Sequence, residues 1–250
     1  AASWMGDVPV LAQAFRVYAV DVIGEPGFSA PSRPPLDSAA YAEWLDAVLD
    51  GLGVDRAAFV GISLGGWLAL ECATRRSERV SALALLCPGG VGRHRNVLWW
   101  ALPLLLLGPW GRREVMRRIA GHQPFGEPSP ETEAFGAFMQ LIFAHFRPRT
   151  ERLPRFSDAA LQHLTMPLMA VLGGRDVFID SAGTRDRLTT NVPGAEVVYL
   201  PEAGHMLIGH AATIDSFLRR SLLRTVETAH DPLGSGAAGT PGPSRRYSSA

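Results

Sequence analysis

The chain contains no lysine, so its 24 basic residues are all arginine, and 24 acidic residues balance them to a formal net charge of zero. It has no run of basic residues, and the pair Arg245–Arg246 is too small for the electropositive footprint that nucleic-acid binding requires. We attribute the arginine, with the abundant Ala, Gly and Pro, to the base composition of a GC-rich genome. The charge pattern therefore excludes nucleic acid as an expected partner.

Cysteine and long apolar segments are also scarce. Cys72 and Cys87 are too few for a disulfide framework, and we expect both to be reduced core thiols. The longest apolar run, Val97–Leu107, contains a proline and is shorter than the roughly twenty residues that span a bilayer. The first ten residues lack the charged and apolar regions of a signal peptide. We therefore expect a cytoplasmic protein with no transmembrane segment, and its oligomeric state is not indicated.

The most informative segment surrounds one serine. The apolar residues Ala57–Val60 predict a buried strand, and Trp67–Ala73 has the composition of a helix packed behind it. Between them, Gly61 and Gly65 flank Ser63 in the G-x-S-x-G pattern of a nucleophile elbow, a strained strand-to-helix turn. We expect only very small residues to fit on either side of the serine. The turn would present the hydroxyl at a helix N-terminus, where negative charge on a reacting oxygen is stabilised.

A serine hydroxyl becomes a good nucleophile only when a base removes its proton and an acid orients that base. Asp176 follows a predicted strand over Thr165–Leu172, and His205 lies in the loop after a predicted strand over Ala195–Leu200. These positions predict Asp176 as the orienting acid and His205 as the base, with Asp180 as the alternative acid. The other histidines lack such a position and show no metal-ligand spacing, so we expect no metal and no cofactor.

Each of these residues also has a plain structural interpretation. Ser63 can be read as a small turn residue, and His205 as a packed loop histidine. Asp176 can be read as a helix cap or as a partner of Arg175. Their joint placement favours the catalytic interpretation.

The chain order Ser63, Asp176, His205 resembles the catalytic triad of the α/β-hydrolase superfamily. The likeness spans about residues 4–224, and residues 16–29 are most similar to the corresponding strand and loop of bacterial serine carboxylesterases. The resemblance implies an α/β fold, a mostly parallel sheet with a helical cap insertion, and a strand at Val17–Val20. In the family a further strand lies between that strand and the one at Ala57–Val60.

The family also uses a second oxyanion donor from the loop after an earlier strand, usually marked by a His-Gly pair. No such strand or pair precedes Trp4, so the resemblance implies a chain that is truncated at its N-terminus, lacks the N-terminal strands and is impaired in activity.

Composition changes along the chain predict three regions. Residues 1–90 and 161–228 form the hydrolase core, residues 91–160 a helical cap, and residues 229–250 a disordered tail that is rich in Gly, Ser and Pro. Helices are expected over Arg113–Ile119 and Glu133–Phe146 in the cap, and over Ala211–Val226 at the end of the core. The apolar residues expected to wall the substrate pocket are Trp99, Trp100, Leu104, Phe138, Met139 and Ile142.

The implied reaction is hydrolysis of a small-molecule carboxylic ester through an acyl-enzyme, with the backbone N–H of Leu64 holding the oxyanion. A thioester, a lactone or a C–C bond would require the same residues. A cofactor-free perhydrolase of the same fold and a catalytically impaired binding protein on a hydrolase scaffold also stay open. The sequence does not indicate the acyl chain length or the physiological substrate.

Overall fold

Four parallel strands form one sheet in the order β1-β2-β3-β4. They are β1 (Ala57–Ile62), β2 (Val80–Leu86), β3 (Leu168–Gly173) and β4 (Glu196–Leu200). The computed structural model describes residues 1–120, 130–147, 149 and 151–230. The strands predicted over Ala57–Val60, Thr165–Leu172 and Ala195–Leu200 are present, with ends that shift by up to three residues.

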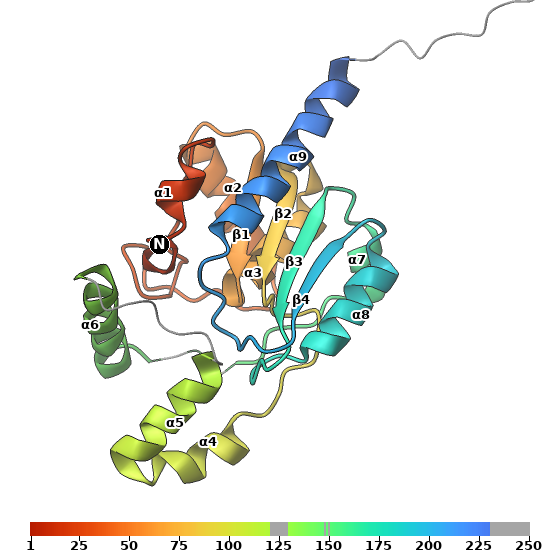
Figure 1. Ribbon diagram of the computed structural model, residues 1–250. Coiled ribbons are helices and arrows are strands. Elements are labelled where there is room, and N and C mark those ends of the chain that lie inside the picture. Colours follow the sequence, from red (N-terminus) through yellow and green to blue (C-terminus); the bar gives the residue numbers. More distant parts are fainter. Residues whose placement is uncertain (121–129, 148, 150, 231–250) are drawn as a thin grey trace, which may run out of the picture.

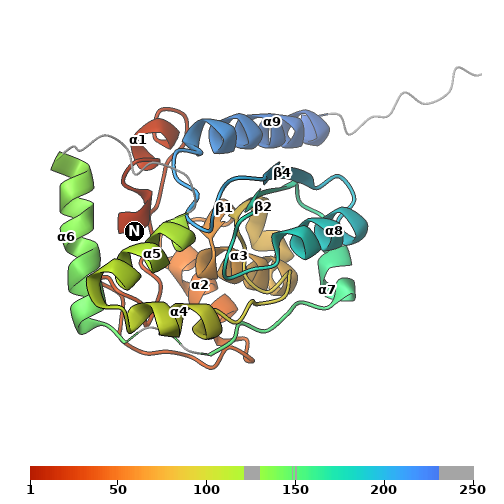
Figure 2. The ribbon, with the colours of Figure 1, turned by 60° about the horizontal axis from the view of Figure 1, so that its bottom comes forward.

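Helices cover both faces of this sheet (Figures 1 and 2). One face carries α2 (Ala40–Gly51), α3 (Leu64–Arg75), α7 (Asp158–Gln162) and α8 (Ser181–Asn191). The other carries α1 (Val8–Leu11) and α9 (Ala211–His230). Two short 3₁₀ turns, η1 (Ala2–Trp4) and η2 (Ser77–Arg79), complete this part of the chain.

The central strands show why the fold has three layers. In β2, Leu83 and Leu85 join the core on the α3 side, whereas Ala82 and Ala84 join the core on the α9 side. All four side chains are fully buried. A strand with both faces covered reads as a continuous apolar run rather than an alternating one, which explains the sequence of β2.

The predicted cap segment contains α4 (Leu98–Leu105), α5 (Gly108–Ala120) and α6 (Pro130–His145). The helices expected over Arg113–Ile119 and Glu133–Phe146 are therefore present. Figure 1 shows α4 and α5 as a hairpin beyond the carboxyl ends of the strands, and these two helices pack chiefly on each other. Gly111 permits their crossing, because a Cβ at this position would lie 1.6 Å from the carbonyl oxygen of Leu104.

The prediction of a strand over Val17–Val20 is wrong. Within the described residues this segment pairs with no strand, and the sheet ends at β1. An extended segment becomes a strand only when a neighbour supplies the ladder of hydrogen bonds, and no strand lies beside this one. The following loop is held by Asp21, whose carboxylate accepts the N–H of Phe28 at 3.0 Å.

The end of the chain also differs from expectation. The closing helix α9 starts at Ala211 as predicted but continues to His230, so the first two residues assigned to the disordered tail are helical. Residues 231–250 of that predicted tail lie outside the described residues. In the described part of the chain, no helix combines the length and the apolar character needed to cross a membrane.

Candidate active site

Ser63 occupies the sharp turn between β1 and α3. Its φ of 52° and ψ of −110° lie in a region that residues other than glycine rarely adopt. The turn is fixed from both sides. The N–H of Ser63 donates to Leu86 O at 2.9 Å, and its carbonyl accepts the N–H groups of Trp67 and Gly89 at 3.0 and 3.1 Å. The strained serine expected from the motif is therefore observed.

The two flanking glycines differ in how much the turn constrains them. A Cβ at Gly61 would lie 2.4 Å from the carbonyl oxygen of Gly65, so no larger residue fits there. A Cβ at Gly65 would meet nothing within 4 Å. The expectation that both positions require a very small residue is right for Gly61 and wrong for Gly65, because the crowding involves the main chain of residue 65 and not its side chain.

Three side chains from distant parts of the sequence converge at the carboxyl edge of the sheet. Ser63 follows β1, Asp176 follows β3 and His205 follows β4, and parallel strands end at the same edge. The Nε2 atom of His205 lies 3.0 Å from Ser63 Oγ, and its Nδ1 atom lies 2.7 Å from Asp176 Oδ2. This chain of hydrogen bonds can move a proton from the hydroxyl to the imidazole.

Asp176 is buried, with 1% of its surface exposed, and its second oxygen is also engaged. Oδ1 accepts the backbone N–H groups of Phe178 at 2.7 Å and Ile179 at 3.0 Å. Burial acts to raise the pKa of the Asp176 carboxyl, but the hydrogen bond and charge of His205 and the two backbone donors outweigh it and lower the pKa overall. The carboxylate is therefore ionised at neutral pH and oriented toward the imidazole.

Cys87 is a neighbour of this carboxylate that the sequence did not reveal. It ends β2 with a positive φ of 41°, is fully buried, and is free as expected. Burial raises the pKa of its thiol, and the negative charge of Asp176 raises it further. The thiol therefore stays protonated beside that carboxylate. Its position at a strand end, next to the strand that carries the acid, was the available signal.

In the described part of the chain, Cys87, Asp176 and His205 are the one group whose ligand atoms lie close enough for a metal ion, within 4.8 Å of one another. The imidazole already bonds to the carboxylate through Nδ1 and to Ser63 through Nε2. A thiol that stays protonated is a poor ligand, because metals bind the thiolate. The donor set fits a hydrogen-bond relay better than a metal centre.

The histidine is positioned by the segment that was predicted to be the cap. The backbone N–H of His205 donates to Ile119 O, near the end of α5, at 3.1 Å. The ring of Phe178 meets the imidazole edge to face, with 4.8 Å between centroids. Arg95, at the start of the segment, donates its N–H to Phe178 O at 2.8 Å. The loops of the acid and of the histidine are therefore both bonded to residues 91–120.

The alternative acid has a different partner. Asp180 is the N-cap of α8, and its side chain accepts the N–H of Gly183 at 3.1 Å. A carboxylate in this role satisfies one of the free N–H groups at the helix start. The geometry therefore favours Asp176 as the partner of His205.

Leu64, expected to supply the oxyanion donor, is the first residue of α3. The first N–H groups of a helix have no acceptor within it, so this N–H is available beside Ser63. The helix dipole adds to its affinity for negative charge.

The residues expected to wall the pocket lie on two helices. Trp99, Trp100 and Leu104 lie on α4; Phe138, Met139 and Ile142 lie on α6. Trp99 is 81% exposed, and the guanidinium of Arg118 covers the Trp100 ring at 5.3 Å. The Met139 side chain lies outside the described part of the structure.

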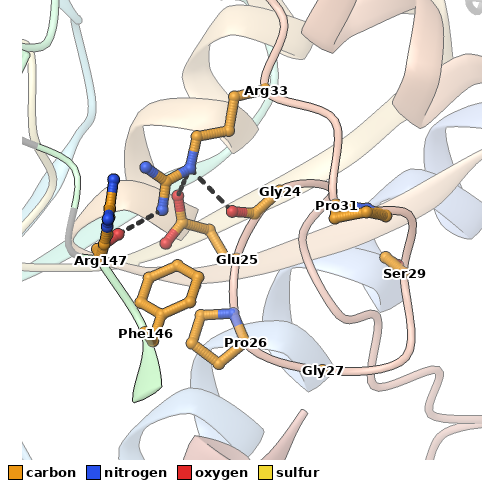
Figure 3. Close-up of a pocket in the computed structure, with 9 residues that line it drawn as sticks. All are labelled: Gly24, Glu25, Pro26, Gly27, Ser29, Pro31, Arg33, Phe146 and Arg147. Atoms are coloured by element: carbon orange, nitrogen blue, oxygen red, sulfur yellow. Dashed lines mark hydrogen bonds and ion pairs between the residues drawn. The ribbon is translucent and has the colours of Figure 1, made fainter. Parts of the chain in front are cut away.

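None of the six lines either of two shallow hollows in the described structure. One hollow lies where residues 24–33 meet the residues after α6 (Figure 3). There, Arg33 donates to the carbonyl oxygens of Gly24 and Arg147 at 2.9 and 2.8 Å. The other lies beside α3 and α7, around Glu71 and Phe156. The pocket assignment remains a prediction.

The chain is similar to known proteins of the same architecture. A model of the alpha/beta hydrolase family matches residues 1–214. Carboxylesterase YbfK from Bacillus subtilis (strain 168) is 28% identical over 210 residues, which are 82% of this chain and 70% of the relative. The crystal structure of naproxen esterase (carboxylesterase NP) from Bacillus subtilis aligns with a TM-score of 0.69 at 25% identity, over 87% of this chain and 77% of that one. The expected similarity to bacterial carboxylesterases is confirmed.

A solved structure whose protein is named for a different activity has the same fold. The meta-cleavage product hydrolase CumD from Pseudomonas fluorescens IP01 aligns with a TM-score of 0.66 at 21% identity, over 92% of this chain and 86% of that one. This level of identity shows the fold alone.

Proposed function

The chain belongs to the α/β-hydrolase family, and we propose that it hydrolyses carboxylic esters, with Ser63 as nucleophile, His205 as base and Asp176 as orienting acid. The observation that supports this proposal most directly is the pair of hydrogen bonds at 3.0 and 2.7 Å that joins the three side chains. The relatives named carboxylesterases support the choice of an ester as substrate.

In the first step, Ser63 Oγ attacks the ester carbonyl carbon while His205 Nε2 takes the hydroxyl proton. The carbonyl electrons move onto the oxygen, and the Leu64 N–H stabilises the resulting oxyanion. Asp176 stabilises the imidazolium. When the tetrahedral intermediate collapses, the imidazolium gives its proton to the departing alcohol, and the acyl group stays on Ser63.

In the second step, His205 removes a proton from water as the water oxygen attacks the acyl carbon. Collapse of the second intermediate releases the carboxylic acid, and the proton returns to Ser63 Oγ. We infer that α4 to α6 act as a cap that excludes water from this site and offers apolar surface to the acyl group.

A fluorophosphonate probe tests the nucleophile directly, because it labels only an activated serine. We expect labelling at Ser63 in the wild-type chain, no labelling in Ser63→Ala, and at least a hundredfold slower labelling in His205→Ala. His163→Ala is the matched control, because that exposed histidine bonds, among the described residues, to the Ala159 carbonyl alone. A folded chain in which the probe labels His205→Ala as fast as wild type contradicts the proposal.

The same preparations then test the ester specificity. Hydrolysis of 4-nitrophenyl esters should be lost in Ser63→Ala, and a series of acyl chains from acetate to palmitate would define the acyl preference. A labelled enzyme that cleaves none of these esters would indicate another acyl bond.

A further inference from the structure

The α4–α5 hairpin carries an apolar surface that nothing in the described structure covers. Within twelve residues, six large apolar side chains are exposed: Trp99, Leu102, Leu105, Leu106, Leu107 and Trp110. Trp99 and Leu106 each expose 81% of their surface. Trp99 and Leu102 on α4 and its C-cap residue Leu106 are spaced so that they lie along one side of the helix. Soluble monomers rarely leave more than a few hundred Å² of contiguous apolar surface uncovered, so this hairpin surface calls for a partner.

The charge around the hairpin surface indicates the kind of partner. Residues 91–120 contain six arginines, one glutamate and no aspartate, although the whole chain is neutral. The single glutamate, Glu114, is already bonded by Arg117 and Arg118, at 2.7 and 2.8 Å. Arg112 and Arg113 are exposed, and within the described residues neither forms an ion pair. The surface therefore combines exposed tryptophan and leucine with uncompensated positive charge.

We propose that the α4–α5 hairpin docks onto the surface of an anionic lipid bilayer. Tryptophan favours the bilayer interface, leucine enters the boundary of the acyl chains, and arginine attracts anionic headgroups. A second copy of the chain fits less well, because a twofold contact through this patch would bring one arginine cluster toward the other.

The hairpin also connects this surface to the catalytic residues. Trp110 lies in the first turn of α5, and Ile119, nine residues later, bonds to the backbone of His205 at 3.1 Å. Nine helical residues span about 14 Å, so the length of α5 joins the hairpin surface to His205. On the basis of the proposed esterase function, we infer that the substrates are esters with lipid-soluble acyl groups that enter from the membrane.

Flotation of the full chain with vesicles tests the docking. One set of vesicles is an equal mixture of phosphatidylcholine and phosphatidylglycerol, and the other is phosphatidylcholine alone. We expect the wild-type chain to float with the mixed vesicles. The double variant Leu106→Ser/Trp110→Ser should partition at least about a hundredfold less, at about tenfold or more for each apolar side chain removed. The variant Arg112→Gln/Arg113→Gln should lose about fivefold for each arginine, on mixed vesicles only.

The matched control is Phe28→Ser/Leu223→Ser, because both side chains are apolar and well exposed but lie outside the hairpin. This control should float like the wild-type chain. All variants should melt at the wild-type temperature, because exposed side chains are replaced. If the wild-type chain floats with neither set of vesicles, the docking proposal is wrong. It is also wrong if Leu106→Ser/Trp110→Ser floats as fully as the wild type.

Two further readouts separate the alternatives. Sedimentation velocity shows whether the hairpin surface joins two copies; a dimer that Leu106→Ser/Trp110→Ser dissociates, without flotation, overturns the lipid proposal. Hydrolysis of soluble 4-nitrophenyl butyrate should be the same in Leu106→Ser/Trp110→Ser as in the wild type. A wild-type chain that floats but hydrolyses no ester contradicts the proposed function and leaves the docking intact.

Discussion

Replacing Asp176 by asparagine isolates the role of its charge. Asparagine has nearly the same shape, and its side-chain oxygen can keep accepting the N–H groups of Phe178 and Ile179, now at 2.7 and 3.0 Å. The change falls on the other atom, which lies 2.7 Å from His205 Nδ1. There a carboxylate oxygen that accepts a hydrogen bond becomes an amide nitrogen that donates one.

The consequence for His205 is a change of tautomer. When Nδ1 must accept a hydrogen bond, the imidazole proton sits on Nε2, and Nε2 can no longer take the proton of Ser63. A substitution that imposes the wrong tautomer in this way lowers kcat by about 10⁴-fold, or about 5.4 kcal/mol in the activation free energy. The free energy of unfolding should change by only about 1 kcal/mol, because the two backbone donors keep their acceptor.

The assay is hydrolysis of 4-nitrophenyl butyrate, with a thermal melt on the same samples. Asp180→Asn is the matched control, because Asp180 caps α8 through Gly183 N–H and asparagine caps as well as aspartate. This control should keep both wild-type activity and stability. If Asp176→Asn retains more than a tenth of the wild-type kcat, or if Asp180→Asn loses as much as Asp176→Asn, the assignment of the acid is wrong.

Three other predictions use the surroundings of the site. Gly61→Ala should destabilise the fold by about 1–3 kcal/mol and reduce esterase activity, because its Cβ would overlap the Gly65 carbonyl. Gly65→Ala should be near wild type in both stability and activity. Equal effects of the two substitutions would contradict the geometry. Cys87→Ala should keep more than about a tenth of the wild-type kcat/KM, because the protonated thiol lies beside the Asp176 carboxylate but forms neither of the two hydrogen bonds that join Ser63, His205 and Asp176; a loss as large as that of Asp176→Asn would contradict this. Burial lowers the pKa of His210, and a nearby aspartate opposes the shift. As the pH falls, the unfolded chain therefore protonates this imidazole at a higher pH than the folded chain does. The free energy of unfolding should therefore fall as pH drops from about 7.5 through the ordinary histidine value of about 6.5, and His210→Gln should flatten this slope in denaturant titrations.

The parts of the fold that the sequence predicted are those that local patterns determine. The elbow was readable because β1, Ser63 and α3 are consecutive, and because Gly61 reports a contact with residue 65 only four positions away. The positions of Asp176 and His205 were readable because each follows an apolar strand, and parallel strands bring such loops to one edge.

The parts that the sequence did not predict depend on contacts between distant segments. The apolar residues of Val17–Val20 favour a strand, but strand formation requires a neighbour, and no local pattern reports whether one is present. The thiol of Cys87 looks like any core cysteine until the sheet places β2 beside β3. The apolar composition of α4 led to a prediction of pocket walls, but composition does not tell which side of a helix faces inward.

These differences suggest that the proposed chemistry and the proposed docking are physically separable. The three side chains proposed to be catalytic follow strands of the sheet, and among the described residues the two core clusters of that sheet contain none from α4 or α5. In contrast, α4 and α5 pack chiefly on each other, and a main-chain hydrogen bond from His205 to Ile119 links the hairpin to the site. A main-chain hydrogen bond survives side-chain substitution on either partner. Changes to the exposed residues of the hairpin should therefore alter which esters reach Ser63 while leaving the hydrolysis of a small soluble ester unchanged.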